Sequence, residues 1–238
     1  MITETKKNVV KRKGVESEGK FQIKATGKAF RILSDGLYSD KIRAIMRELS
    51  CNAYDAHVDA KNLDKPFVIH MPNRLEPTFK IRDYGIGLSH DDVINVYTTY
   101  FESTKTDSND YIGCLGLGSK SPFSYVDNFS IISYLKGKKR IYNAFLNEEE
   151  TPTIALLSES NTKEANGLEV SFPVQANDTR RFEETAQDVF TYFKLKPKFE
   201  GAKIEVKDIT YILKGSSWGI RNNQYGGSSK SPEKSSRS

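Results

Sequence analysis

The chain has 238 residues, 37% of them hydrophobic and 28% charged, so it is long enough to bury one sizeable core. The Lys and Arg residues behind its net charge of +5 crowd both ends and the segment 136–140, a distribution more typical of solvated tails than of a nucleic-acid interface. Cys51 and Cys114 lack metal-ligand spacing, which suits a reducing compartment, and no apolar run approaches membrane-spanning or secretory-signal length.

The first part of the chain passes from a charged arm into short periodic segments. Residues 1–20 are polar, charged and interrupted by glycine, which predicts a flexible N-terminal arm or an added strand rather than core. Ser39 or Asp40 supplies the N-cap of a long helix. The apolar periodicities predict, in chain order, strand 21–25, helix 28–33, helix 39–57, strand 66–71 and strand 78–82.

The middle of the chain begins with a capped helix and continues into a sheet. Ser89 precedes acidic residues and apolar residues at helical spacing, which predicts a helix over 89–101. The polar stretch 102–111 has the composition of a mobile loop, and a glycine cluster at 113–118 follows it. Four strand candidates at meander spacing then predict an antiparallel sheet with a hairpin turn at Lys136-Gly137: 129–135, 140–146, 153–157 and 168–172.

The last part of the chain sets the expected fold class and domain limits. An amphipathic helix is predicted over 178–193 and one or two strands over 203–213. Strands interleaved with helices in a non-alternating order indicate an α+β two-layer sandwich, with helices on one face of a mixed, mainly antiparallel sheet. We expect one main domain, the start of a following segment or second domain, and a disordered Ser-rich tail: 21–200, 201–224 and 225–238.

The helix predicted over 39–57 carries three polar residues on one face. Glu48, Asn52 and Asp55 are four and then three residues apart, and they follow the edge of an apolar stripe. Side chains at the rim of a buried stripe point into a cleft more naturally than into open solvent. A solvated polar edge is the alternative, because Glu and Asp on helices usually face water. The stripe consists of Ile42, Ile45, Met46, Leu49, Ala53 and Ala56.

Two glycine patterns make a nucleotide the leading candidate ligand. Asp83-x-Gly85-x-Gly87 follows a predicted strand, and a Gly-x-x-Gly-x-Gly loop occupies 113–118. Glycines allow close backbone approach, and exposed N–H groups at a helix start cradle phosphate. The loop is neither a Walker A sequence nor a dinucleotide fingerprint, because the Lys placement, the glycine order and the βαβ context do not match.

These residue types suit the recognition and hydrolysis of ATP. Asp83 at a strand end can accept the exocyclic amine of adenine, although an Asp-initiated turn would have the same sequence. Asn52 can complete an octahedral Mg²⁺ whose other ligands are phosphates and water. Glu48, one helical turn away, can orient or deprotonate the attacking water, and Asp55 can brace the neighbouring turn.

The same stretches resemble the motifs of the GHKL superfamily, whose members include the gyrase B subunit, the large heat-shock chaperone, histidine kinases and MutL. RELSCNAYDAH resembles its N box, IRDYGIGLS its first glycine box and YIGCLGLGSKSPFSY its second. The longer runs KAFRILSDGLYSDKIRAIMRELSCNAYDAH and YTTYFESTKTDSNDYIGCLGLGSKSPFSY are similar more narrowly to the rIIA lysis-inhibition accessory proteins of T-even-like bacteriophages. The similarity covers about residues 20 to 215.

The resemblance implies the Bergerat ATP-binding fold with ATP and Mg²⁺ between helices and sheet. Glu48 would be the general base, Asn52 the Mg²⁺ ligand, Asp83 the adenine-reading acid and the stretch 103–111 the ATP lid. The remaining nucleotide-binding residues would be Asp55, Gly85, Gly87, Lys105, Gly113, Leu115, Gly116, Leu117, Gly118, Ser119 and Lys120.

Two departures from the superfamily pattern stand beside the resemblance. Leu168 occupies the place of a Thr that usually helps to fix the adenine, and the lysine that a following domain gives to the γ-phosphate in gyrase and MutL has no evident source. No phospho-acceptor helix precedes the N box, which weighs against a histidine kinase.

The resemblance implies a nucleotide-driven conformational switch in the cytoplasm of an infected host cell, with slow Mg-dependent ATP hydrolysis. ATP binding would couple to homodimerisation, to an rIIB-like phage protein or host factor, or to peripheral attachment at the inner membrane. The alternative is a non-enzymatic adaptor that binds ATP structurally and recruits a phage or host protein.

Overall fold

The computed structural model describes residues 26–36, 38–99, 118–207, 211–215 and 219–221. The predicted strand 21–25, loop 102–111 and tail 225–238 lie outside these ranges. Its helices are α1 (Gly27–Gly36), α2 (Lys41–Asp59), α3 (His90–Thr98) and α4 (Thr179–Phe190), with the 3₁₀ helices η1 (Gly118–Ser124) and η2 (Ala176–Asp178). None of the described helices is long and apolar enough to cross a membrane.

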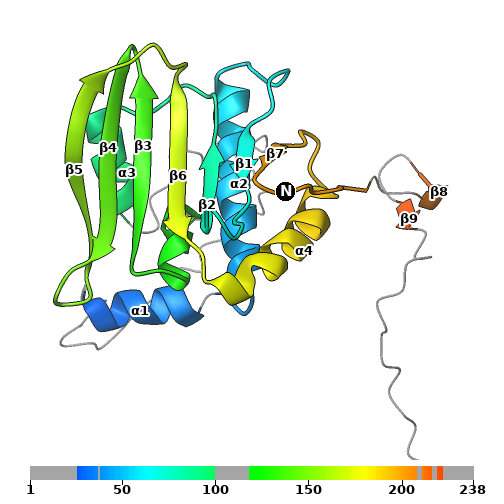
Figure 1. Cartoon of the computed structure of the whole chain (residues 1–238), viewed down its shortest axis with the longest axis horizontal. Helices are drawn as coiled ribbons and strands as arrows, with labels where there is room; N and C mark the ends of the chain where they lie inside the picture. The colour runs from blue at the N-terminus through cyan, green and yellow to red at the C-terminus, as the bar shows by residue number, and fades with distance from the viewer. Residues whose placement is uncertain (1–25, 37, 100–117, 208–210, 216–218, 222–238) are drawn as a thin grey trace, which may run out of the picture.

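Seven strands form one twisted sheet in the order β5-β4-β3-β6-β2-β1-β7 (Figure 1). All neighbouring pairs are antiparallel except β1 and β7, which are parallel. The strands are β1 (Val68–His70), β2 (Thr78–Arg82), β3 (Asn128–Leu135), β4 (Lys138–Leu146), β5 (Pro152–Asn161), β6 (Gly167–Pro173) and β7 (Lys198–Glu200), and a separate pair consists of β8 (Tyr211–Lys214) and β9 (Gly219–Arg221).

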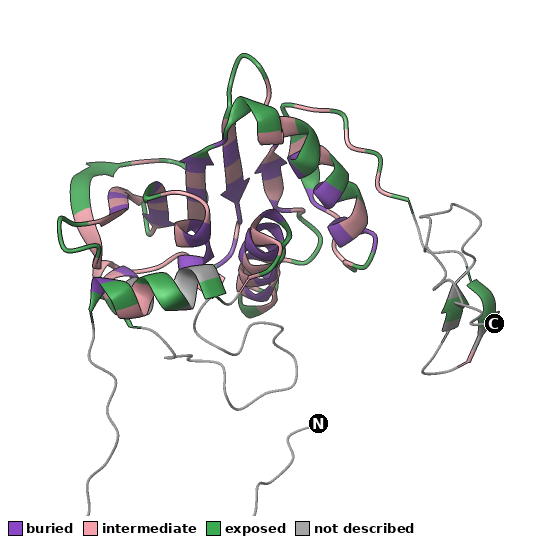
Figure 2. Ribbon diagram, turned by 90° about the horizontal axis from the view of Figure 1, so that it is seen from below, coloured by how far each residue is buried: buried purple, intermediate pink, exposed green. Residues whose placement is uncertain are grey.

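One face of the sheet and the inner sides of the helices share a single hydrophobic core. In β2, Phe79 and Ile81 are buried opposite Phe172 and Val170 of β6, while the residues between them are half-exposed. This period-2 alternation places every second side chain against the helices. Figure 2 shows buried residues along the strands and α2. The α+β two-layer prediction is therefore confirmed.

Helix α2 forms where its sequence predicts it and is the helix most deeply inserted in the core. Asp40 is the N-cap, and its carboxylate accepts a hydrogen bond from the Arg43 backbone N–H at 3.2 Å. The predicted stripe is buried from Ile42 to Ala53. Asp55 and His57 are fully buried as well, although both are polar. The end of α2 is thus enclosed by polar contacts, which the apolar pattern does not predict.

Two other elements carry local signatures that the structure confirms. Ser89 and Asp92 form a reciprocal capping box at the start of α3. The β3–β4 turn has positive φ at Lys136 and Gly137, 50° and 76°, the backbone of a two-residue hairpin.

The C-terminal part of the chain differs from its prediction. Strand β7 was not predicted, and residues 203–207 do not form a strand. Ile204 and Val206 nevertheless pack against the core, so their alternation reflects burial without strand pairing. Helix α4 ends at Phe190, three residues earlier than predicted, and the ring of Phe193 still packs on Phe190 with centroids 5.1 Å apart.

Candidate functional site

The exposed side of α2 meets the start of η1 at Glu48 and Asn52. A Cβ atom on Gly118 would lie 2.9 Å from Glu48 Oε2 and 3.4 Å from Asn52 Nδ2. The second predicted glycine segment therefore ends directly against the polar face of α2. The lack of a side chain at Gly118 keeps the Glu48 carboxylate and the Asn52 amide close to this backbone.

Glu48 pairs with a neighbouring arginine and lies close to a buried cysteine. Its Oε1 accepts a hydrogen bond from Arg47 Nη2 at 2.9 Å, and its side chain is 23% exposed. Burial, followed by the negative charges of Glu48 and Asp55, raises the pKa of the Cys51 thiol to about 12. Cys51 is therefore a neutral, buried thiol at pH 7, whereas the Glu48 carboxylate reaches solvent.

Asp83 lies just beyond the end of β2 and is only 7% exposed. Its Oδ1 accepts hydrogen bonds from the backbone N–H groups of Gly85, at 2.9 Å, and Leu168, at 3.1 Å. Burial raises the pKa of this carboxyl, and the two hydrogen bonds oppose that shift. Because both bonds fall on Oδ1, Oδ2 is the oxygen that can accept from a ligand.

Glycines allow the turn after Asp83 to pack against its neighbours. A Cβ atom on Gly85 would lie 2.6 Å from both the Cβ and the carbonyl oxygen of Ala56 in α2. Gly87 has φ +76° and faces the backbone carbonyl of Tyr134 in β3. Gly167 has φ +138° and faces the backbone carbonyl of Asp83. The turn is thus fixed between α2, β3 and β6.

We predict that Gly85→Ala destabilises the fold by about 1–3 kcal/mol, because the new methyl group overlaps backbone that cannot move aside. Thermal unfolding measures the effect. Gly36→Ala is the matched control, because a Cβ there meets nothing within 4 Å. Equal unfolding temperatures for the two variants would show that the turn is not packed as described.

Arg82 is a buried residue of this region that sequence reasoning missed. Its guanidinium lies over the rings of Tyr134, at 4.1 Å, and Tyr84, at 4.8 Å, and it donates to the backbone carbonyls of Asp83 and, at 2.6 Å, Ala165. It thereby joins the loop before β6 to the Asp83 turn. In the sequence, Arg82 is one of several polar residues in an alternating strand. Nothing in that pattern predicts its burial or its contacts.

The predicted site residues divide between described and undescribed segments. Ser119 is half-buried, and Lys120 is buried at 4% exposure. Asp55 is fully buried on α2. The other predicted nucleotide-binding residues lie outside the described ranges: Lys105, Gly113, Leu115, Gly116 and Leu117.

Helix α2 joins the two groups of residues. Glu48 and Ala56 are eight residues apart in the helix, a rise of about 12 Å. Glu48, Asn52 and Gly118 therefore lie at one end of this span, and the Asp83 turn at the other.

Within the described ranges no three His, Cys, Asp or Glu side chains gather as a metal site. A single amide ligand fits Mg²⁺ that arrives with phosphates and water, the usual coordination of Mg²⁺ bound to a nucleotide.

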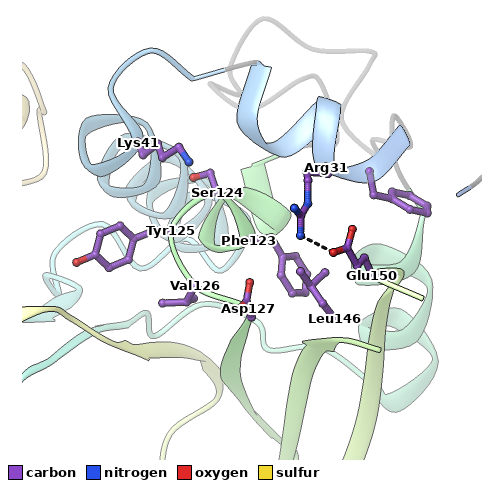
Figure 3. A pocket seen from close by; sticks show the side chains of 10 residues that line it. Arg31, Lys41, Phe123, Ser124, Tyr125, Val126, Asp127, Leu146 and Glu150 are labelled. Atoms are coloured by element: carbon purple, nitrogen blue, oxygen red, sulfur yellow. Dashed lines mark hydrogen bonds and ion pairs between the residues drawn. The ribbon is translucent and has the colours of Figure 1, made fainter. Parts of the chain in front are cut away.

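A separate cavity of about 230 Å³ lies beneath α1 (Figure 3). Phe123, Val126 and Leu146 line it, and an ion pair of 2.6 Å between Arg31 and Glu150 links α1 to the β4–β5 turn beside it. None of the predicted site residues lines this cavity. It therefore adds nothing to the arrangement around α2.

A comparison with known proteins identifies a distant relative. No family model matches the chain. The chaperone protein HtpG of Rhodococcus jostii (strain RHA1) is 26% identical over 156 residues, a match that covers 54% of this chain and 24% of that protein. The chain thus matches about a quarter of the length of this relative.

Proposed function

We propose that this chain is an ATP-binding domain of the GHKL type. The observation that carries the proposal is the span of α2, which has a metal- and phosphate-compatible group near its middle and the buried carboxylate turn of Asp83 against its end. An extended nucleoside triphosphate needs recognition at two such points. The similarity to a chaperone supports the proposal, because the large heat-shock chaperone is one of the GHKL proteins whose motifs this sequence resembles.

At the base end, Asp83 would accept a hydrogen bond from the exocyclic amine of adenine through Oδ2. Its Oδ1 is occupied by the N–H groups of Gly85 and Leu168, which fixes the plane of the carboxylate before a ligand arrives. The backbone of Leu168 contributes at the place where the superfamily has Thr, and its side chain packs against the core. We therefore expect base recognition to rest on Asp83 without a hydroxyl at position 168.

At the phosphate end, Asn52 would hold Mg²⁺ through its amide oxygen, and Mg²⁺ when bound would neutralise phosphate charge. Glu48 would orient the attacking water and take its proton. Backbone N–H groups of the segment 113–118 would bind the phosphates, with Ser119, Lys120 and Lys105 beside them. Asp55 would brace the helix beneath.

The finer proposal is an rIIA-like module that acts as a nucleotide-driven switch during phage infection, in the host cytoplasm or peripheral to the inner membrane. It is supported by the motif similarity over the N box and the second glycine box. ATP binding would promote homodimerisation or contact with an rIIB-like or host protein. The alternative remains an adaptor that binds ATP structurally and does not hydrolyse it.

Calorimetry with Mg-ATP tests the proposed function. We expect saturable binding to the wild-type chain with one site per chain, weakened when Mg²⁺ is chelated because Asn52 offers the metal a ligand. Mg-GTP is the matched control ligand, because its 6-oxo group cannot donate to Asp83. Heat of binding that is absent for ATP, or equal for ATP and GTP, would contradict an adenine site.

A further inference from the structure

The last turn of α2 holds a fully buried histidine whose two ring nitrogens both have partners. His57 Nε2 accepts a hydrogen bond from the Tyr84 backbone N–H at 2.9 Å, and Nδ1 lies 2.9 Å from the Asn62 carbonyl oxygen. A nitrogen that accepts from a backbone N–H carries no proton. These partners assign the ring proton to Nδ1, which donates to Asn62, so the imidazole is neutral.

Asn62 completes the attachment of Tyr84 to the end of α2. Its Nδ2 donates to the Tyr84 backbone carbonyl at 3.0 Å. The backbone N–H and C=O of Tyr84 are therefore both held, one by His57 and the other by Asn62. The His57 ring also meets the rings of Phe67 and Tyr84 edge-on, with centroids 6.2 and 6.4 Å away. Packing and hydrogen bonding together leave the imidazole one orientation.

Tyr84 stands between Asp83 and Gly85, so its position determines that of the carboxylate turn. The N–H of Gly85 is one of the two donors to Asp83 Oδ1, and Gly85 itself packs on Ala56, the neighbour of His57. Without the hydrogen bond from its N–H to His57, Tyr84 would be free to move, and Tyr84 connects Asp83 to the Gly85 N–H that Asp83 binds. The direction of Oδ2 would then no longer be set before a ligand binds.

We propose that His57 is a positioning residue for base recognition: through Tyr84 it fixes the Asp83 carboxylate so that the site selects purines that carry an exocyclic amine at position 6. This inference rests on the proposed function, in which Asp83 accepts from that amine. A purine with a 6-oxo group presents an oxygen to the carboxylate and is rejected only while the carboxylate is held in place. His57 thus governs selectivity for the base without touching the nucleotide.

The test compares binding of Mg-ATP and Mg-ITP, whose bases differ at position 6, by calorimetry. We expect the wild type to prefer ATP by about tenfold or more, and His57→Phe, which keeps a ring but removes both hydrogen bonds, to lose most of that preference. The Kd for ATP should rise about tenfold while that for ITP changes little. His57→Gln retains an acceptor for the Tyr84 N–H and should keep a larger part of the preference.

Control variants separate positioning from general destabilisation. His70→Phe alters the half-buried histidine of β1, whose Nε2 lies 3.3 Å from Glu76 Oε2, and should keep the wild-type ratio of the two Kd values. Asp83→Asn should bring the Kd values for Mg-ATP and Mg-ITP close to each other. If His57→Phe does not fold, Asn62→Ala, which removes the bond to the Tyr84 carbonyl, provides the same comparison.

Each outcome has a distinct meaning. A wild type that binds neither nucleotide overturns the proposed function. A wild type that prefers ATP, with an Asp83→Asn variant that does not, leaves the proposed function standing. In that case, a folded His57→Phe protein that keeps the wild-type ratio, or that weakens ATP and ITP equally, overturns the role of His57.

Discussion

The Asp83→Asn protein is expected to bind Mg-ATP about a hundredfold more weakly than the wild type while unfolding at the same temperature or higher. The Asn side chain has the shape of Asp, and its Oδ1 can still accept from the N–H groups of Gly85 and Leu168. Its Nδ2 then occupies the place of Oδ2 and meets the adenine amine with a second donor. Calorimetry measures the loss of affinity, and thermal unfolding of the nucleotide-free protein measures stability.

The stability difference between these two proteins should depend on pH in a defined direction. Burial raises the pKa of Asp83, so the folded wild type binds the proton more tightly than the unfolded chain does. The stability linked to that proton is present below the ordinary carboxyl pKa and is lost as the pH rises through the raised pKa. Asn does not titrate, so its advantage over Asp should grow as the pH rises from the ordinary carboxyl range through the raised pKa.

Two results would contradict this account of Asp83. One is an Asn variant that binds Mg-ATP as tightly as the wild type. The other is a stability difference that stays constant or shrinks as the pH rises. Glu76→Gln at the exposed β1–β2 turn is the matched control for removal of a carboxylate charge, because it lies away from the Asp83 turn.

The sequence predicts those elements whose cause is local. The Asp40 cap of α2, the capping box of α3 and the Lys136-Gly137 turn each depend on residues within four positions of one another, and all three have the expected geometry. Strand β2 begins and ends at its predicted residues because its alternation continues without a break. Such short-range causes are readable without knowledge of the rest of the fold.

Elements whose cause is tertiary could not be predicted. Strand β7 is three residues long and exists because β1 offers a parallel edge, with Ile69 beside Phe199. Residues 203–207 show the opposite case, in which Ile204 and Val206 alternate inward but no neighbouring strand pairs with them. Period-2 alternation reports which side chains are buried and does not report which backbone is paired.

In the candidate site, too, the residues with a local sequence signature could be predicted, and those that depend on tertiary contacts could not. Glu48, Asn52 and the Asp83-x-Gly-x-Gly turn are visible as side-chain motifs. The contribution of Leu168 is a backbone N–H, which any residue could supply, and that of His57 depends on the fold placing Tyr84 beside it. In the sequence, His57 is one of three histidines that lie far apart and belong to no recognisable motif. Sequence motifs therefore reveal the residues that would contact a ligand. They do not reveal the residues that hold those contact residues in place.

The Glu48→Gln protein is expected to hydrolyse ATP about 10²–10⁴-fold more slowly than the wild type while binding Mg-ATP with nearly unchanged affinity. Gln keeps the length of the side chain and an oxygen that can accept from Arg47 Nη2, so the packing against Gly118 is preserved. Gln cannot take a proton from the attacking water. Hydrolysis therefore loses its general base, whereas nucleotide binding is unaffected. Steady-state phosphate release with calorimetry on the same preparations measures the two effects separately.

Glu184→Gln on α4 is the matched control, because its carboxylate is 61% exposed and pairs only with Arg180 in the same helix turn among the described residues. It should leave both hydrolysis and binding unchanged. If the wild type releases phosphate no faster than Glu48→Gln while both bind Mg-ATP, the chain is an adaptor that uses ATP structurally. If Glu48→Gln instead weakens binding and hydrolysis together, Glu48 supports the nucleotide in its ground state, and the assignment of a general base to α2 fails.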